Sequence, residues 1–280
     1  MISRYSRRKI ANYTFTAGTV VATLLALSAL VLILYSLLAQ GLGGIDADVF
    51  TKSTPAPGSP GGLLNAIVGS VMLCVAAMVI SVLVGILAGT WLAEMGGDSH
   101  YGRIIRFLND VLLAAPSILV GLFVYEIMVK PFHGFSGWAG AVALAFLATP
   151  IVTRTTEDIL NLQPHALRES GMALGAPQWV TIRKIIWRSA GGGMLTGGLL
   201  GFARISGETA PLLFTSLNNQ FFSLDMGKPM ASLPAVIFQF ALSAYDDWRR
   251  LAWAGALLIA VAVLSVNIIG RILAREPRWK

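Results

Sequence analysis

The feature that most constrains this chain is a set of six long apolar stretches. A transmembrane helix needs about 20 mainly apolar residues to cross a hydrocarbon core about 30 Å thick. The stretches of sufficient length lie near 15–38, 64–92, 108–129, 137–153, 187–210 and 250–273. A further apolar segment, 231–243, is too short to span and contains Pro234, so we expect a re-entrant or interfacial piece rather than a seventh crossing. The sequence therefore predicts an all-α polytopic membrane protein with six transmembrane helices in a single domain over residues 1–280.

Composition supports this class and argues against bound cofactors. Of the 280 residues, 55% are hydrophobic and 12% charged, and the mean hydropathy is +0.71, far from the balance of a soluble domain. The single cysteine, Cys74, lies in an apolar run, so we expect a buried thiol and no intramolecular disulfide. The histidines, His100, His133 and His165, fall in polar connecting segments, which leaves no intramembrane imidazole pair for haem or a metal. We therefore expect no metal or cofactor on this chain.

The basic residues predict the orientation in the membrane, because cytoplasmic loops carry an excess of lysine and arginine. If the N-terminus is cytoplasmic, most of the 21 basic residues fall in inner segments and at inner helix ends, namely Arg4, Arg7, Arg8, Lys9, Arg103, Arg106, Arg154, Arg168, Arg183, Lys184, Arg188, Arg271, Arg275, Arg278 and Lys280. The outer set is Lys52, Lys130, Lys228, Arg249 and Arg250. This asymmetry predicts six helices with both termini cytoplasmic. The net charge of +7 then reflects topology and contact with anionic membrane lipid, with no need for nucleic acid.

The longest cytoplasmic segment, 154–186, contains the pattern of a short helix. Pro164 occupies a good first helical position, and Gly175 and Pro177 then end the helix in the usual order. The residues that share one face by helical spacing are Ala166, Leu167, Gly171 and Leu174. By periodicity alone, an amphipathic helix lying on the lipid surface remains an open interpretation.

The same segment resembles the EAA loop of importer-type ABC permeases. In L-R-E-S-G-M-A-L-G-A-P-Q-W-V-T-I-R-K-I-I, Glu169, Gly175 and Ile185 match the family spacing, whereas 170–171 replace two alanines and 187–188 replace Leu-Pro. The resemblance implies a MetI-like permease fold, in which this loop inserts a short helix into a cleft of a cytoplasmic ATPase. The ATPase-coupling residues that it implies are Arg168, Glu169, Ala173, Leu174 and Gly175.

The chain has no phosphate-binding loop of its own, since the pattern G-x-x-x-x-G-K-[ST] does not occur in it. ATP and Mg²⁺ are therefore expected on a separate ATPase subunit. The chain itself is expected to be a transport subunit and not an enzyme.

Glycines in the fifth apolar stretch predict a close helix contact. Gly193, Gly197 and Gly201 are spaced by four residues, which forms a stripe of small residues that lets another helix approach. Gly85 and Gly89 form a second pair of this kind. Two other stretches are interrupted by Pro116 and Pro150, where we expect kinked packing.

Two opposite charges, Arg204 and Glu208, follow the glycine stripe. Both fall on nearly the same side of a helix of 3.6 residues per turn, so we expect them to face protein or a water-filled path. A charge deep in a membrane helix costs about 2.5 to 3.5 kcal/mol even on the lenient insertion scale. A simple pair between the two residues would offset part of this cost. The alternative that we favour is a transient oxyanion on the planar arginine fork, with Glu208 preventing too tight a hold.

The surrounding residues resemble the PstA family, one of the two permease subunits of the bacterial phosphate ABC importer. The likeness lies in A-R-I-S-G-E-T-A-P-L-L-F-T from Ala203, A-P-S-I-L-V-G-L-F-V-Y from Ala115, F-S-G-W-A-G from Phe135 and P-I-V-T-R-T-T-E-D from Pro150. It implies a phosphate path through Arg204, Glu208 and Thr209, with Arg154 as a second candidate. For Arg154, an arginine that only reaches toward lipid headgroups is the alternative.

The resemblance also implies the partners and the location. They are a second, PstC-like permease, two PstB-like ATPase subunits and a periplasmic, PstS-like phosphate-binding protein, in the bacterial inner membrane. Transport would proceed by alternating access, with motor closure pulling the 165–175 helix. A permease for sulfate or molybdate stays open as an alternative, because an arginine fork alone does not select among tetrahedral anions. An ion-coupled secondary transporter is a weaker alternative, since it calls for internal repeats and several buried carboxylates.

Overall fold

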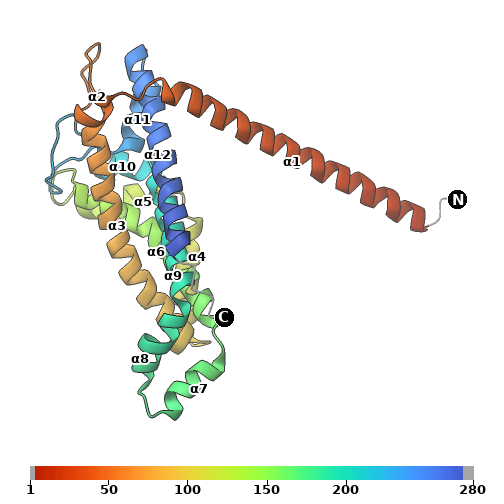
Figure 1. Ribbon diagram of the computed structural model, residues 1–280. Helices are drawn as coiled ribbons and strands as arrows, with labels where there is room; N and C mark the ends of the chain where they lie inside the picture. The colour runs from red at the N-terminus through yellow and green to blue at the C-terminus, as the bar shows by residue number, and fades with distance from the viewer. Residues whose placement is uncertain (1–3, 274–280) are drawn as a thin grey trace.

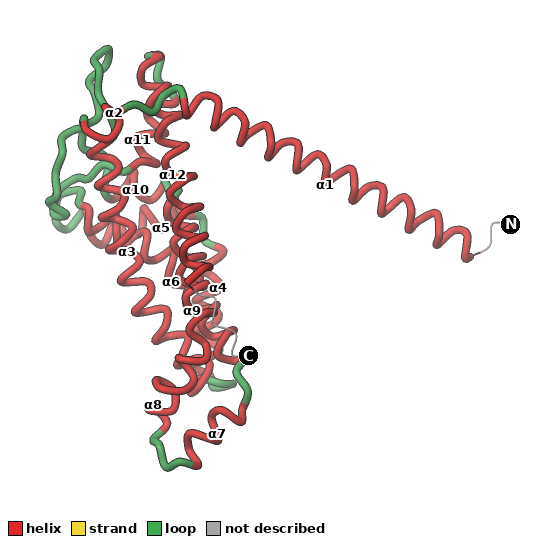
Figure 2. Tube along the Cα trace, in the orientation of Figure 1, coloured by secondary structure: helices red, strands yellow, loops and turns green. Residues whose placement is uncertain are grey.

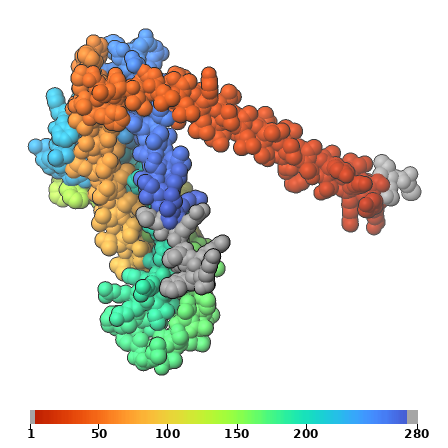
Figure 3. Space-filling model, in the orientation of Figure 1, coloured from red at the N-terminus to blue at the C-terminus, as the bar shows by residue number. Residues whose placement is uncertain are grey.

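The computed structural model describes residues 4–273, and within this range every regular element is a helix (Figures 1 and 2). The predicted all-α fold is thereby confirmed. The first helix, α1 (Arg4–Leu42), projects away from the other helices as a separate rod (Figure 3). No residue of its most apolar 18-residue stretch is buried in the structure. It contacts the bundle near its end, where Gly41 lies against Leu257 and the carbonyl of Gly43 accepts a hydrogen bond from Arg250.

The centre of the bundle is formed by α3 (Leu64–Trp91), α6 (Gly137–Asn161) and α9 (Trp187–Ser206). The α3 helix continues into a π-helical turn, η1 (Leu92–Gly96). Glycines allow α3 and α6 to touch: a methyl group on Gly85 would lie 2.7 Å from Cβ of Val152. Apolar side chains from these helices, such as Leu73, Leu144 and Ile205, form the main core.

The third apolar stretch is not one straight helix, which corrects the predicted span 108–129. It consists of α4 (His100–Ala114) and α5 (Ser117–Val124), which meet at an angle of 107°, followed by a second π-helical turn, η2 (Tyr125–Val129). The break lies at Pro116, because proline lacks an N–H and forces the preceding Ala115 into an extended conformation (φ −66, ψ 133). Pro150, in contrast, lies inside the continuous helix α6.

The C-terminal part begins with α10 (Ala210–Thr215) and ends with α11 (Leu233–Ala241) and α12 (Asp246–Leu273). The short segment predicted not to span the membrane is α11, whose nine residues cannot cross a bilayer. It packs on α12, where Phe240 stacks on Trp248 with ring centroids 4.3 Å apart. A small helix, α2 (Ala47–Thr51), covers the same end of the molecule through Val49.

At the opposite end, the chain forms α7 (His165–Ala173), α8 (Gln178–Thr181) and a third π-helical turn, η3 (Ile182–Ile186) (Figure 1). The inner segment predicted at 154–186 is therefore shorter, because α6 continues as a helix to Asn161 before the chain turns.

Length and hydropathy identify four helices in residues 4–273 that could cross a membrane, and five if α4 and α5 count as one broken span. The predicted number was six. The predicted span that does not meet the hydropathy criterion is α9. Its 20 residues give a length of about 30 Å, enough to cross, but two arginines and many glycines lower its mean hydropathy.

Candidate functional site

The glycine stripe of α9 lies directly on α6. A methyl group added to Gly193 would lie 2.6 Å from a side-chain carbon of Ile159, and one added to Gly197 would collide with the hydroxyl of Thr155. Gly201 is looser, with Val152 at 3.3 Å from the same hypothetical atom. The stripe thus holds α9 against α6 and fixes the position of the helix end above it.

Arg204 and Glu208 meet at this helix end. Nη2 of Arg204 lies 3.3 Å from Oε1 of Glu208, and their side chains are 50% and 13% exposed. The simple pair considered from the sequence is therefore present. One nitrogen faces one oxygen, however, and a guanidinium has five N–H donors, so the half-exposed arginine keeps donors for another anion.

Glu208 does not belong to the same helix as Arg204, which corrects the predicted range 187–210. The helix ends at Ser206, Gly207 caps it, and Glu208 donates its backbone N–H to the carbonyl of Ile205 over 3.2 Å. The chain starts again at α10, with Pro211 in its first turn. Since proline cannot continue the hydrogen-bond ladder of α9, the break falls just before it. Arg204 thereby occupies the last turn of α9, where the helix dipole favours a positive charge.

Thr209 lies at the start of α10 and is half-buried. Its carbonyl accepts hydrogen bonds from Leu212 and Leu213 at 3.1 and 3.3 Å, which closes the first turn of that helix. The predicted trio Arg204, Glu208 and Thr209 is consequently gathered in one short break between two helices.

Arg154 lies on α6, and two carboxylates surround it. Its guanidinium is 3.8 Å from Asp110 of α4 and 3.5 Å from Asp158 one turn along α6. All three side chains are about half exposed, which places them on an open polar face of the bundle. Two acidic neighbours reduce the attraction of this arginine for an anion, because opposite charges within about 4 Å satisfy it locally.

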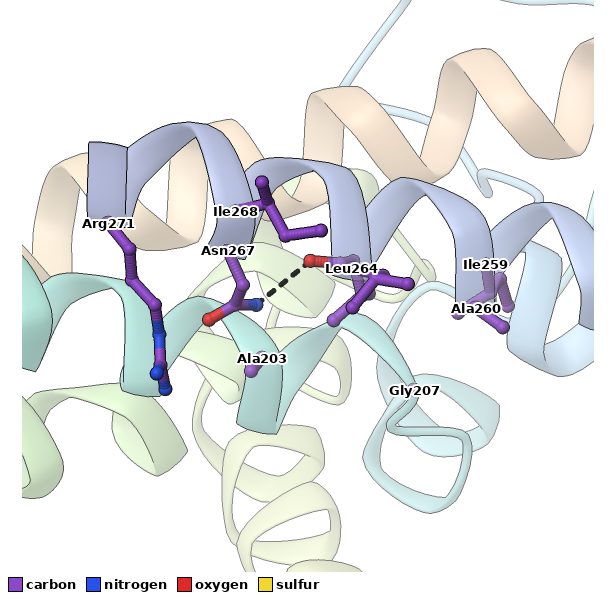
Figure 4. A pocket seen from close by; sticks show the side chains of 9 residues that line it. Ala203, Gly207, Ile259, Ala260, Leu264, Asn267, Ile268 and Arg271 are labelled. Atoms are coloured by element: carbon purple, nitrogen blue, oxygen red, sulfur yellow. Dashed lines mark hydrogen bonds between the residues drawn. The ribbon is translucent and has the colours of Figure 1, made fainter. Parts of the chain in front are cut away.

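A groove runs between α9 and α12 beside the Arg204 turn (Figure 4). It has a volume of about 560 Å³, and Ala203 and Gly207 form its α9 side. Asn267 and Arg271 are its polar side chains, and the amide of Asn267 donates to the carbonyl of Val263 on its own helix over 2.9 Å. The remaining walls are apolar, so the groove lacks the converging donors that an oxyanion site requires.

The helix predicted in the inner segment is present as α7. Gly175 follows it with φ +75, a conformation that glycine adopts without strain. Glu169, Ala173 and Leu174 are exposed, Leu174 to 85%. The sequence-predicted apolar face is only partly correct, because Gly171 is buried against Thr181 while Leu174 faces outward.

The side chain of Arg168 points away from this outer surface, whereas the predicted coupling residues Glu169, Ala173 and Leu174 are exposed on it. Its Nη2 lies 2.7 Å from Oε1 of Glu94 in η1, and its Nε donates to both oxygens of that carboxylate at 3.1 and 2.9 Å. The side chains are 18% and 5% exposed. The hydrogen bonds to Glu94 raise the pKa of the Arg168 guanidinium further above its ordinary value. Arg168 thus makes a partly buried internal contact and is not part of the exposed surface of α7.

A second partly buried ion pair lies next to the first. Nε of Arg106 is 2.6 Å from Oε1 of Glu157, whose side chain is 6% exposed. Sequence reasoning missed Glu94 and Glu157 as structural residues. The signal available for Glu94 was a carboxylate at the end of a long apolar run, one residue before the glycine pair Gly96-Gly97. Within the described residues, no group of three or more His, Cys, Asp or Glu side chains is placed to hold a metal ion.

Comparison with known proteins gives consistent matches. Residues 81–279 match the family model described as binding-protein-dependent transport system inner membrane component. A phosphate transport system permease protein PstA of Pasteurella multocida (strain Pm70) is 52% identical over 265 residues, which cover 95% of each chain. A protein of the same description from Haemophilus influenzae is 51% identical over 275 residues, 98% of each chain.

Among solved structures, an inward-facing MetNI methionine ABC transporter is similar, with a TM-score of 0.64 over 76% of this chain and 94% of the other. A second crystal form of that transporter gives a TM-score of 0.61. Sequence identity is 15% in both cases, so these matches concern the fold alone.

Proposed function

This chain belongs to the binding-protein-dependent transport permeases and, within them, to the PstA phosphate transport system permeases, and on that premise we propose that it forms one half of a pore that carries inorganic phosphate inward. The observation that carries the proposal is 52% identity to a phosphate permease over 95% of both chains. The chain is a transport component and not an enzyme. Hydrolysis of ATP takes place on a separate subunit.

The exposed surface of α7 is the proposed contact with that ATPase. The side chains that project from it are those of Glu169, Ala173 and Leu174. A further exposed side chain, Trp179 of α8 at 62%, follows five residues after Leu174 in the sequence. The inner side of α7 is occupied by the chain's own residues through Gly171 and Arg168. This arrangement favours a docked helix over one that lies on lipid, because its packed side is unavailable to a membrane.

Arg204 is the proposed contact for phosphate in the path. An incoming oxyanion competes with Glu208 for the guanidinium, since a charge-assisted hydrogen bond to phosphate resembles the one to a carboxylate. Glu208 then recovers the arginine when the anion leaves, which keeps the site from holding its cargo permanently. Thr209 offers a hydroxyl in the same turn, and Arg154 is a secondary contact whose two acidic neighbours weaken it.

The proposed assembly contains this chain, a PstC-like second permease, two PstB-like ATPase subunits and a PstS-like periplasmic phosphate-binding protein. Both termini lie on the cytoplasmic side of the inner membrane in this arrangement, because the basic residues of α7, η3 and the chain ends then lie inside. Closure of the ATPase pair draws on α7, and the break after α9 opens toward the outside.

The test is uptake of labelled phosphate by vesicles that hold the full complex, with the binding protein supplied outside. We expect ATP-dependent uptake that excess sulfate leaves unchanged. Absence of uptake contradicts the proposed function. Equal competition by sulfate or molybdate assigns the pore to tetrahedral oxyanions in general.

A further inference from the structure

The side chain of Arg168 connects α7 to the ends of α3 and α6, which docking of α7 on an ATPase would not by itself require. We propose that the Glu94–Arg168 ion pair is a rigid joint through which a displacement of α7 moves the inner end of α3. Both residues are positioning residues and touch no substrate. The inference rests on the proposed function in one respect, namely that an ATPase displaces α7.

Arg168 joins its own helix α7 to two other elements through one side chain. Its Nε and Nη2 hold the Glu94 carboxylate of η1, its Nη1 donates to the carbonyl of Gln163 over 2.8 Å, and Nη2 also donates to the carbonyl of Leu160 over 2.8 Å. The guanidinium therefore connects α7 with the end of α3 and with the end of α6. A planar fork held at all three nitrogens has little freedom to slide.

Burial makes the joint unfavourable to open. The Glu94 side chain is 5% exposed, and a buried carboxylate that loses its partner is left with an uncompensated charge. Separation of α7 from η1 would create that charge. Movement of both elements together avoids it, so a pull on α7 is passed to η1 instead of breaking the contact.

The other side of η1 is also held. Arg106 donates to the carbonyls of Leu92 and Gly97 at 3.3 and 2.7 Å, at the two ends of η1, while its Nε binds Glu157 of α6. The π-helical turn thus lies between two arginines, one from α7 and one from α4. A displacement of η1 is consequently shared by α3, α4 and α6. Two of these helices, α3 and α6, pack against α9.

The first test compares two acidic residues in similar turns. Glu94 and Glu126 both lie in π-helical turns and both pair with a basic side chain, but the Glu126–Lys130 pair is exposed, at 58% and 64%. In vesicles with the full complex, phosphate transported per ATP hydrolysed is measured for Glu94→Gln, Glu94→Asp and Glu126→Gln. We expect Glu94→Gln to lower this ratio about tenfold, within the usual range of coupling between sites. Glu94→Asp should recover part of it, and Glu126→Gln should match the wild type.

An unchanged ratio in Glu94→Gln overturns the proposal, and so does an equal loss in Glu126→Gln. Because Glu94→Gln could fail to assemble, a second test leaves the pair intact. Spin labels are placed in the complex at Met95 of η1 and Met172 of α7, which are 56% and 55% exposed, with Cys74→Ser to remove the native thiol. A second pair joins Met172 with Phe221, an 81% exposed residue of the loop after α10.

On ATP binding, we expect the Met95–Met172 distance to stay constant while the Met172–Phe221 distance changes. A change between Met95 and Met172, or no change between Met172 and Phe221, overturns the joint. These distances do not depend on the transported anion. If the wild-type complex moves no phosphate, the proposed function fails while the spin distances still decide on the joint.

Discussion

The guanidinium of Arg204 lies 3.3 Å from the carboxylate of Glu208, across the point where α9 ends. The arginine belongs to the last helical turn and the glutamate to the following turn, so the charges can separate without unwinding α9. The close contact of the glycine stripe with α6 holds the arginine side of the pair. The pair therefore joins the fixed end of α9 to the turn that leads into α10.

Replacement Arg204→Gln should reduce phosphate uptake about tenfold or more while the complex still assembles. The reason is that a hydrogen bond to a charged group contributes about 1.5–3 kcal/mol, and the neutral amide loses that contribution. Uptake of labelled phosphate and co-purification of the subunits measure the two effects. Arg188→Gln, which removes an exposed arginine from the first turn of the same helix, is the control and should transport normally. Normal uptake by Arg204→Gln would remove this residue from the path.

Replacement Glu208→Gln should affect binding and turnover in opposite directions. Without the competing carboxylate, Arg204 holds phosphate longer, so we expect a lower KM for uptake together with a lower maximal rate. Initial uptake rates across a range of external phosphate concentrations separate the two. A raised KM would contradict the competition between Glu208 and the anion.

Sequence patterns predicted the features that depend on local spacing. The stripe of Gly193, Gly197 and Gly201 predicted a close helix contact, and the structure places α6 against it. The order Pro164, Gly175 and Pro177 predicted the short helix α7 and where it ends. Membership of the permease family, implied by the EAA loop and the motif at Ala203, is also confirmed.

Features that depend on distant partners could not be predicted in this way. Arg168 looked like a surface residue because its neighbours match a docking loop, but its partner Glu94 lies 74 residues earlier in the chain. The end of α9 at Ser206 is a different case, because Gly207 and Pro211 are local stop signals that helical periodicity alone does not take into account. The 107° bend at Pro116 likewise exceeds what a proline alone specifies, because the packing of α5 on α10 through Gly121 and Pro211 contributes to it.

Replacement Glu169→Lys should detach or uncouple the ATPase. The residue is exposed on α7, and a reversed charge in a docked interface typically costs several kcal/mol through repulsion. Co-purification of the ATPase with the permeases and uptake per ATP are the measurements. Asp98→Lys makes the same charge reversal at an exposed position between η1 and α4, and it should leave both quantities unchanged. Unaltered coupling in Glu169→Lys would exclude this face of α7 as the docking surface.

Replacement Gly89→Ala should destabilise the protein by about 1–3 kcal/mol, the usual cost of overpacking a well-packed core. The added methyl group would lie 2.6 Å from the carbonyl oxygen of Thr153 and 2.7 Å from Cβ of Thr156, and neither backbone nor β-branched side chain can yield easily. The matched control is Gly198→Ala, where the nearest heavy atom is a Val82 methyl at 3.9 Å. Thermal unfolding of the purified, detergent-solubilised complex should show a lower Tm for the first variant and no loss for the second. Equal stability of the two would mean that α3 and α6 can move apart at Gly89 without cost, so that their close contact there does not contribute to the stability of the bundle.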